Sequence, residues 1–174
     1  MSNMICFGFG SDKNAMKDNL NMSNGGTSVF INVLCLSGGR LAQTQSQKRF
    51  MVFLAEKNQS VCGIGTVGFD IVDMPWDRDS FEEDKEFMLR VIEGARRKLG
   101  WETLGYEPNE EFVAEYLDTF QKLIERMTAN DIIEESLTKW LSQADENDPV
   151  KCGFPKCKKH DAYICVHGCQ VCTD

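Results

Sequence analysis

The stretch SVFINVLCL at residues 28–36 decides the predicted fold class. It is rich in β-branched and apolar residues, which are typical of strands. It ends at Ser37-Gly38-Gly39, a run of small residues that indicates a turn. Together these features predict a β-strand that is followed by a tight connection.

Further strands are predicted on both sides of this stretch. On the C-terminal side they are FMVFLAE at residues 50–56 and, after a polar turn, residues 60–72. On the N-terminal side, residues 4–9 are expected to form a short strand, whereas residues 11–27 have the composition of a loop. Connections this short favour antiparallel pairs, because parallel pairs need a crossover of roughly a dozen residues or more. The N-terminal half therefore predicts an antiparallel meander of three to four strands.

The pattern becomes helical after Pro75. Residues 79–100 place their apolar side chains on one helical face, with acidic residues in the first turn, basic residues in the last turn and Gly100 at the end. A second helix is predicted from about Asn109 and a third from about Asn130. Strands followed by helices predict an α+β fold in which three helices pack on one face of the sheet.

The C-terminal segment carries the clearest chemical signal. The polar linker DENDP at residues 145–149 predicts a boundary between a body, residues 1–149, and a tail, residues 150–174. The tail holds five of the eight cysteines and both histidines. Two of its pairs have a two-residue gap, which lets a tight turn aim both side chains at one ion. The predicted Zn²⁺ ligands are Cys157, His160, Cys169 and Cys172, with Cys152, Cys165 and His167 as alternates.

This C-x2-H…C-x2-C arrangement resembles the small zinc-ribbon and treble-clef knuckles that occur as appendages on many proteins. The resemblance covers about 20 residues and implies a structural metal held by the same four residues. The spacer of eight residues is short for such a knuckle, and the tail has spare ligands. Three alternatives stay open: a set with Cys152 in place of His160, an iron–sulfur cluster on four cysteines, and reduced thiols without metal.

The charge is distributed unevenly between the two segments. The formal net charge is −8, and the tail carries four lysines against two aspartates, which leaves −10 for residues 1–150. An acidic body repels phosphate backbones, so the charge argues against direct nucleic-acid binding by the body. The negative charge of the body favours a protein partner with a basic surface. The alternative is that the charge only keeps the protein soluble.

These features lead to three functional hypotheses. The preferred one is a non-enzymatic acidic interaction module of the immunity or inhibitor type that carries a structural zinc site. The first alternative is an enzyme that uses carboxylates of the body in a concave site with shifted pKa values. The second is a nucleic-acid adaptor, in which the basic tail interleaves lysines with Phe154 and Tyr163. Homo-oligomerisation is compatible with each of them.

Other signals are interpreted as structural. Residues 63–68 match G-x-G-x-x-G, but they are expected to continue as strand rather than open a helix, so no nucleotide site is predicted. No catalytic residue is assigned. No segment contains the roughly 18 to 20 apolar residues that cross a bilayer, and the N-terminus is a poor signal peptide. A cytoplasmic location with reduced cysteines and no membrane partner is therefore expected.

Overall fold

A computed structural model describes residues 2–8 and 19–172 of the chain. Its strands are β1 (Ser2–Cys6), β2 (Leu20–Ser23), β3 (Asn58–Gln59), β4 (Gly65–Thr66) and β5 (Phe69–Asp70). Its α-helices are α1 (Asn24–Leu41), α2 (Gln45–Glu56), α3 (Phe81–Arg96), α4 (Glu110–Arg126) and α5 (Glu134–Ser142). The fold is thus a mixture of helices and small sheets, as predicted at that coarse level, but the predicted strands and helix arrangement are wrong in detail.

Residues 28–36 are helical, not a strand, and they form the middle of α1. Ser23 is the N-cap of this helix, and its side-chain hydroxyl accepts a hydrogen bond from the backbone N–H of Gly26 (3.1 Å). Every residue from Phe30 to Gly39 is buried, so this part of the helix has no face exposed to solvent. Periodicity does not distinguish a helix that is buried on all sides from a strand, because both appear as an unbroken apolar run.

The Ser37-Gly38-Gly39 run is a packing surface within α1 rather than a turn. The Ser37 hydroxyl donates to the carbonyl oxygen of Val91 in α3 (2.8 Å). A Cβ on Gly38 would lie 1.8 Å from the Met51 sulfur in α2. Small side chains here let neighbouring elements approach the helix closely from different sides.

Residues 50–56 belong to helix α2, so the strand predicted there is also wrong. The helix begins with a capping box in which the Thr44 hydroxyl accepts from the backbone N–H of Gln47, and the Gln47 side chain accepts from that of Thr44. This T-x-x-Q spacing is a known sequence signature of helix N-termini. The sequence therefore contained a local signal for a helix at this position, although the apolar run at residues 50–56 favoured a strand.

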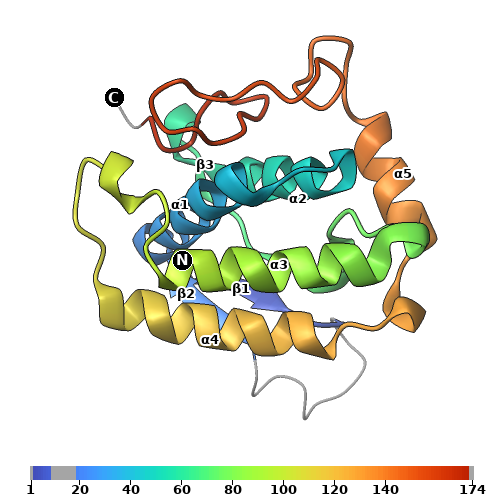
Figure 1. Cartoon of the computed structure of the whole chain (residues 1–174), viewed down its shortest axis with the longest axis horizontal. Helices are drawn as coiled ribbons and strands as arrows, with labels where there is room; N and C mark the ends of the chain where they lie inside the picture. Colours follow the sequence, from blue (N-terminus) through green and yellow to red (C-terminus); the bar gives the residue numbers. More distant parts are fainter. Residues whose placement is uncertain (1, 9–18, 173–174) are drawn as a thin grey trace.

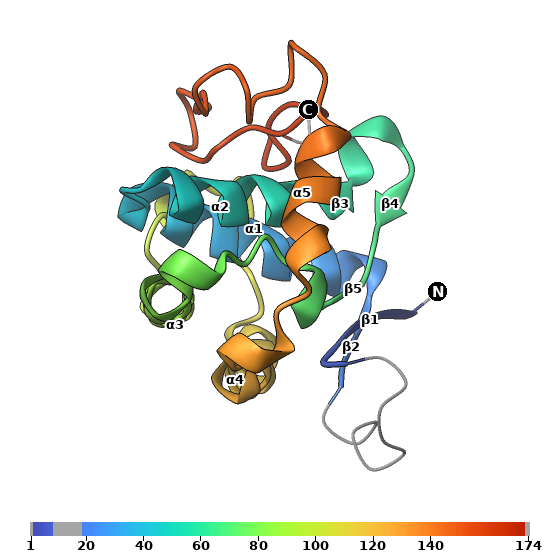
Figure 2. The ribbon, with the colours of Figure 1, turned by 90° about the vertical axis from the view of Figure 1, so that its right-hand side faces the viewer.

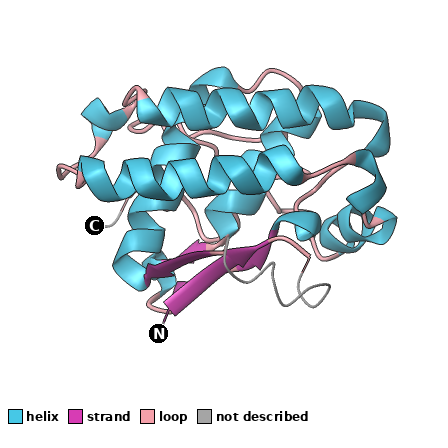
Figure 3. Cartoon of the chain, turned by 90° about the horizontal axis from the view of Figure 1, so that it is seen from below, coloured by secondary structure: helices cyan, strands magenta, loops and turns pink. Residues whose placement is uncertain are grey.

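The sheets are small, and the predicted meander is not formed. Strand β1 lies between β2, to which it is antiparallel, and β5, to which it is parallel, while β3 and β4 form a separate antiparallel pair. Figure 3 shows the strands at one edge of a largely helical molecule. The segment 60–72 is divided between 3₁₀ turns and the two-residue strands β4 and β5. Strand β1 supports the prediction at residues 4–9 only as far as Cys6, and residues 9–18 lie outside the described part.

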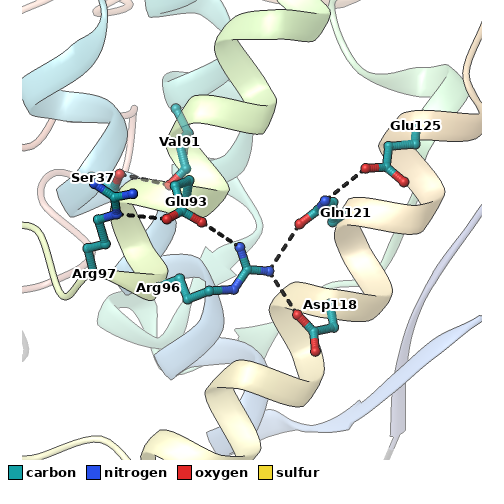
Figure 4. A network of polar contacts seen from close by, with 8 residues as sticks. All are labelled: Ser37, Val91, Glu93, Arg96, Arg97, Asp118, Gln121 and Glu125. Carbon is teal, nitrogen blue, oxygen red and sulfur yellow. Dashed lines mark hydrogen bonds and ion pairs between the residues drawn. The ribbon is translucent and has the colours of Figure 1, made fainter.

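Helices are present at the three places predicted after Pro75, and α3 and α4 start within two residues of the expected positions. Helix α5 starts at Glu134 because a 3₁₀ turn at Ala129–Asp131 precedes it. The Arg96 guanidinium joins α3 to α4, since it donates to Asp118 (2.8 Å) and Gln121 (3.0 Å) as well as to Glu93 (Figure 4). Within the described residues, no helix combines the length and apolar character needed to cross a membrane.

The tail lies across α1 and α2, on the side of the molecule opposite α4 (Figures 1 and 2). Its residues Val150, Phe154, Tyr163 and Cys165 are buried and belong to the same hydrophobic cluster as the helices of the body. Division of the chain after residue 149 stays a prediction. The two segments on either side of that boundary share a core, so each contributes to the stability of the other.

Candidate metal centre

The first pair of predicted ligands is presented by a tight turn. The backbone N–H of Asp161 donates to the carbonyl of Cys157 (2.8 Å), and the N–H of Cys157 donates to the carbonyl of Ala162 (2.9 Å). Asp161 has a left-handed backbone (φ 54°), a conformation that Asp tolerates better than most residues. The turn directs the side chains of Cys157 and His160 to the same point, as the two-residue gap predicts.

The second pair follows another turn. Cys165 and Gly168 exchange backbone hydrogen bonds (3.1 and 2.8 Å), and Gly168 has φ 87°, which is strained for any other residue type. The chain then folds back so that the N–H of Cys172 donates to the carbonyl of Cys169 (3.1 Å). Gly168 thus supplies the sharp bend that brings the second pair to the first.

The four preferred residues form one cluster. The potential ligand atoms of Cys157, His160, Cys169 and Cys172 all lie within 4.8 Å of one another. The Nδ1 atom of His160 is 3.6 Å from the Cys157 sulfur, 3.6 Å from the Cys169 sulfur and 3.3 Å from the Cys172 sulfur. The sulfurs of Cys157 and Cys172 are 3.7 Å apart.

Hydrogen bonding among neutral side chains does not account for this geometry. A neutral imidazole nitrogen has one lone pair, so Nδ1 of His160 is unable to accept three well-aligned S–H donors at once. A cation at the centre of the cluster would be shared by all four atoms. The arrangement therefore has the character of a metal site.

The thiols of the cluster differ in acidity. Burial acts to raise the pKa of Cys157, but the backbone N–H groups of His160 and Lys159 donate to its sulfur, and its pKa falls below the usual thiol value. Burial raises the pKa of Cys169 to about 12, against the effect of the N–H groups of Val171 and Cys172. Metal ligation requires thiolates, so a bound cation would have to displace the proton of Cys169.

The alternates lie elsewhere. Cys152 is exposed and its thiol points to the carbonyl of Glu146 (3.4 Å). Cys165 is buried and donates to the carbonyl of Gly168 (3.6 Å). His167 faces the body, with its Nδ1 3.4 Å from the sulfur of Cys62. Among the described residues, no group of three or more potential ligands contains these alternates, so the four-cysteine set with Cys152 is not brought together.

Two residues of α1 attach the cluster to the body, and sequence reasoning missed both. Arg40 donates from Nη1 to the backbone carbonyl of His160 (3.1 Å). Gly39 packs so closely that a Cβ there would lie 2.3 Å from the carbonyl oxygen of Asp161. Their partners are more than a hundred residues away in the sequence, so no local pattern signals these contacts.

A pocket of about 230 Å³ lies next to the tail. It is lined by the C-terminal end of α2, by α5 and by tail residues that include Val166 and His167. The Glu56 carboxylate in this pocket accepts a hydrogen bond from the Trp140 indole N–H (2.8 Å). Burial raises the pKa of Glu56, and nearby Asp148 adds to the shift.

Comparison with protein-family models, curated proteins and solved structures found no match for this chain. The fold and the site define it as a helix-rich protein with small mixed sheets and a cysteine/histidine cluster in its C-terminal tail. Its function is therefore inferred from the geometry and charge of its own residues.

Proposed function

We propose that the chain is a non-enzymatic protein-interaction module whose tail is held in shape by one structural zinc ion. The observation that carries the zinc assignment is the set of distances within the cluster. A tetrahedral zinc with bonds of about 2.3 Å to sulfur and about 2.0 Å to nitrogen has edges of roughly 3.8 Å between sulfurs and 3.5 Å between sulfur and nitrogen. The Cys157–Cys172 sulfur separation of 3.7 Å and the three sulfur–Nδ1 separations of 3.3–3.6 Å correspond to these edges, and all four atoms lie within 4.8 Å of one another.

The proposed role of the metal is structural because the four protein ligands leave no open position for water or substrate. His160 is buried (2% exposed), and the three cysteines are partly covered. The tail has little regular secondary structure of its own beyond isolated bridges. Metal binding would therefore supply much of the free energy that orders it.

Elemental analysis of the purified chain tests this assignment. The chain is expected to contain about one zinc per molecule, and Cys157→Ser is expected to lose it. The matched control is Cys152→Ser, which removes an exposed tail cysteine outside the cluster and should retain the metal. A metal-free native chain, or equal metal contents in the two variants, would contradict the proposal.

The proposed partner is a protein with a basic surface. Glu82, Glu83 and Glu86 line a shallow hollow on α3, and no ion pair joins them among the residues that the structure describes. The ammonium group of Lys85, the neighbouring cation, instead caps the end of α4 by donating to the carbonyls of Glu125 and Met127. Three exposed carboxylates that form no ion pair with a described residue support electrostatic docking on a positive surface, as in an inhibitor of a nuclease.

Charge-neutralised variants test the docking proposal. The variant Glu82→Gln/Glu83→Gln/Glu86→Gln should fail to retain a partner that the native chain captures from an extract of its source cells. A control with the same charge change at the exposed residues Glu107, Glu111 and Glu135 should retain it. The captured protein is expected to be basic and to dissociate as salt concentration rises. Retention by both variants would contradict the assignment of this face.

The nucleic-acid alternative receives less support from the tail. Phe154 and Tyr163 are 7% and 4% exposed, so their rings are covered rather than available for stacking on bases. The Lys156 ammonium contacts the carbonyl of Gly39 and the Asp161 carboxylate (3.0 Å). The remaining tail lysines form an exposed basic segment without an aromatic platform.

The enzyme alternative is favoured by one observation, the pocket that contains Glu56. A carboxyl group with a raised pKa beside the half-buried Lys57, whose pKa burial lowers, is typical of acid–base sites. In a general screen of hydrolase and lyase substrates, an activity that is lost in Glu56→Gln but kept in Glu107→Gln would favour this candidate. Glu107 is an exposed carboxylate outside the pocket lining and serves as the matched control.

A further inference from the structure

A second cysteine–histidine pair lies outside the cluster. The Cys62 sulfur and the His167 Nδ1 atom are 3.4 Å apart, although 105 positions separate them in the sequence. Cys62 is the last residue of the 3₁₀ turn Ser60–Cys62 and is exposed to solvent. His167 stands in the turn between Cys165 and Gly168 and is half-buried. The docked tail therefore brings an imidazole to an accessible thiol of the body.

We propose that Cys62 and His167 form a second, open site for a thiophilic divalent metal ion such as Zn²⁺. Their separation falls within the 3.3–3.6 Å range of sulfur–Nδ1 distances in the Cys157/His160/Cys169/Cys172 cluster. Two atoms at this distance span one edge of a tetrahedron around zinc. Thiolate sulfur and imidazole nitrogen are also the donor types that zinc binds in preference to oxygen donors.

This site differs from the cluster in its free coordination positions. Two protein ligands leave about two positions of a tetrahedron for water or an external ligand. His167 also lines the pocket that contains Glu56 and Asp148, so an ion on this pair would lie near the pocket. Cys62 is exposed, which gives the ion a direct path from solvent. The site would therefore bind metal more weakly than the cluster and exchange it more readily.

The competing explanation is a simple hydrogen bond between the Cys62 thiol and the His167 ring. That explanation predicts no second metal equivalent. A titration with Co²⁺ separates the two explanations. It uses the full-length chain with its cluster already occupied by zinc. Cobalt on a thiolate gives a sulfur-to-metal charge-transfer absorption, and elemental analysis of the same samples reports whether zinc leaves the cluster.

The native chain is expected to bind one Co²⁺ with this absorption while it keeps its zinc. Cys62→Ser and His167→Asn should each weaken cobalt binding by more than about 100-fold. Loss of a residue that only supports a metal ligand costs roughly 10- to 100-fold, and loss of a ligand itself should cost more. Cys152→Ser, which removes another exposed cysteine, should leave it unchanged. Retained zinc and an unchanged circular-dichroism spectrum show that the variants are folded.

Two results would overturn the proposal: no cobalt absorption in the native chain, or an absorption that persists in both Cys62→Ser and His167→Asn. The proposal requires the folded tail but not the zinc assignment of the cluster. The native chain as purified could also contain no zinc. In that case the cobalt absorption is compared between Cys62→Ser and Cys157→Ser, and the variant that reduces it shows which site holds the cobalt.

Discussion

The tail and helix α1 specify their structures in opposite ways. In the tail, two pairs of ligands with short gaps fix the turns, and the residues that act together lie within sixteen positions of one another. In α1, residues 28–36 favour a strand by composition, yet they are helical in the folded chain, where α1 packs against α2, α3 and α4. Local spacing determines the first region and tertiary contacts determine the second.

The largest effect is expected from removing a ligand of the cluster. Cys157→Ser, or a strong chelator added to the native chain, should release the metal and unfold the tail, because structural zinc contributes on the order of 10 kcal/mol to small metal domains. Limited proteolysis at the exposed Lys158 and Lys159 measures the loss of order. Cys152→Ser should remain resistant to cleavage. Rapid cleavage of the native, metal-loaded chain would show that the metal does not order this segment.

The next effect concerns the contact that joins the two regions. Gly39→Ala places a methyl group against the backbone of Asp161. Backbone atoms are unable to move aside as a flexible side chain does. We expect a loss of about 1–3 kcal/mol in the free energy of unfolding, with the metal retained. Urea denaturation and metal analysis measure the two quantities.

Gly25→Ala is the matched control, since a Cβ at this exposed position of α1 meets nothing within 4 Å. Alanine is the better helix former, so this control should gain about 0.5–1 kcal/mol. If Gly39→Ala gave the same gain, the tail would not pack on α1 as closely as the structure shows.

A smaller effect tests the local signal at the start of α2. Thr44→Ala removes the hydroxyl that accepts from the backbone N–H of Gln47. The expected loss is about 1 kcal/mol in the free energy of unfolding, as for other N-cap positions. Thr138→Ala, at an exposed position inside α5, is a control without a capping role. Equal unfolding midpoints for the two variants would indicate that tertiary packing alone determines α2.

The smallest effect depends on pH. Asp84 in α3 is buried, and burial raises its pKa, although hydrogen bonds from the hydroxyls of Ser46 and Ser80 oppose the shift. A carboxyl group whose pKa is raised by folding stabilises the native state when protonated, and this contribution is lost as pH rises through the folded-state pKa. Asp84→Asn lacks this ionisation, so its stability relative to the native chain should increase from acidic to neutral pH.

Urea unfolding of both chains across this range measures the difference, which we expect to stay within about 1 kcal/mol because the amide retains hydrogen-bonding capacity. Other carboxyl groups titrate in both chains and cancel in the comparison. A difference that moves in the opposite direction would mean that the ionised carboxylate, held by the two serine hydroxyls, stabilises the fold.

Several features were determined by the sequence alone. Helices α3 and α4 follow from amphipathic spacing and end signals, because their polar faces meet solvent and leave the 3.6-residue period visible. The two pairs with a two-residue gap made Cys157, His160, Cys169 and Cys172 the preferred ligands. The sequence left three alternates open, and only the structure shows that the preferred four lie together. The acidic charge of the body is a matter of composition. Each depends on residues within a few turns of one another or on simple counting.

Only the tertiary structure decided the rest. Residues 30–39 of α1 are all buried, so their apolar run carries no period that separates helix from strand. The attachment of the tail through Gly39 and Arg40, and the pairing of Cys62 with His167, join positions more than a hundred residues apart. Such contacts form because the whole chain gains free energy by burying its apolar surface, and no local pattern records which distant surfaces meet.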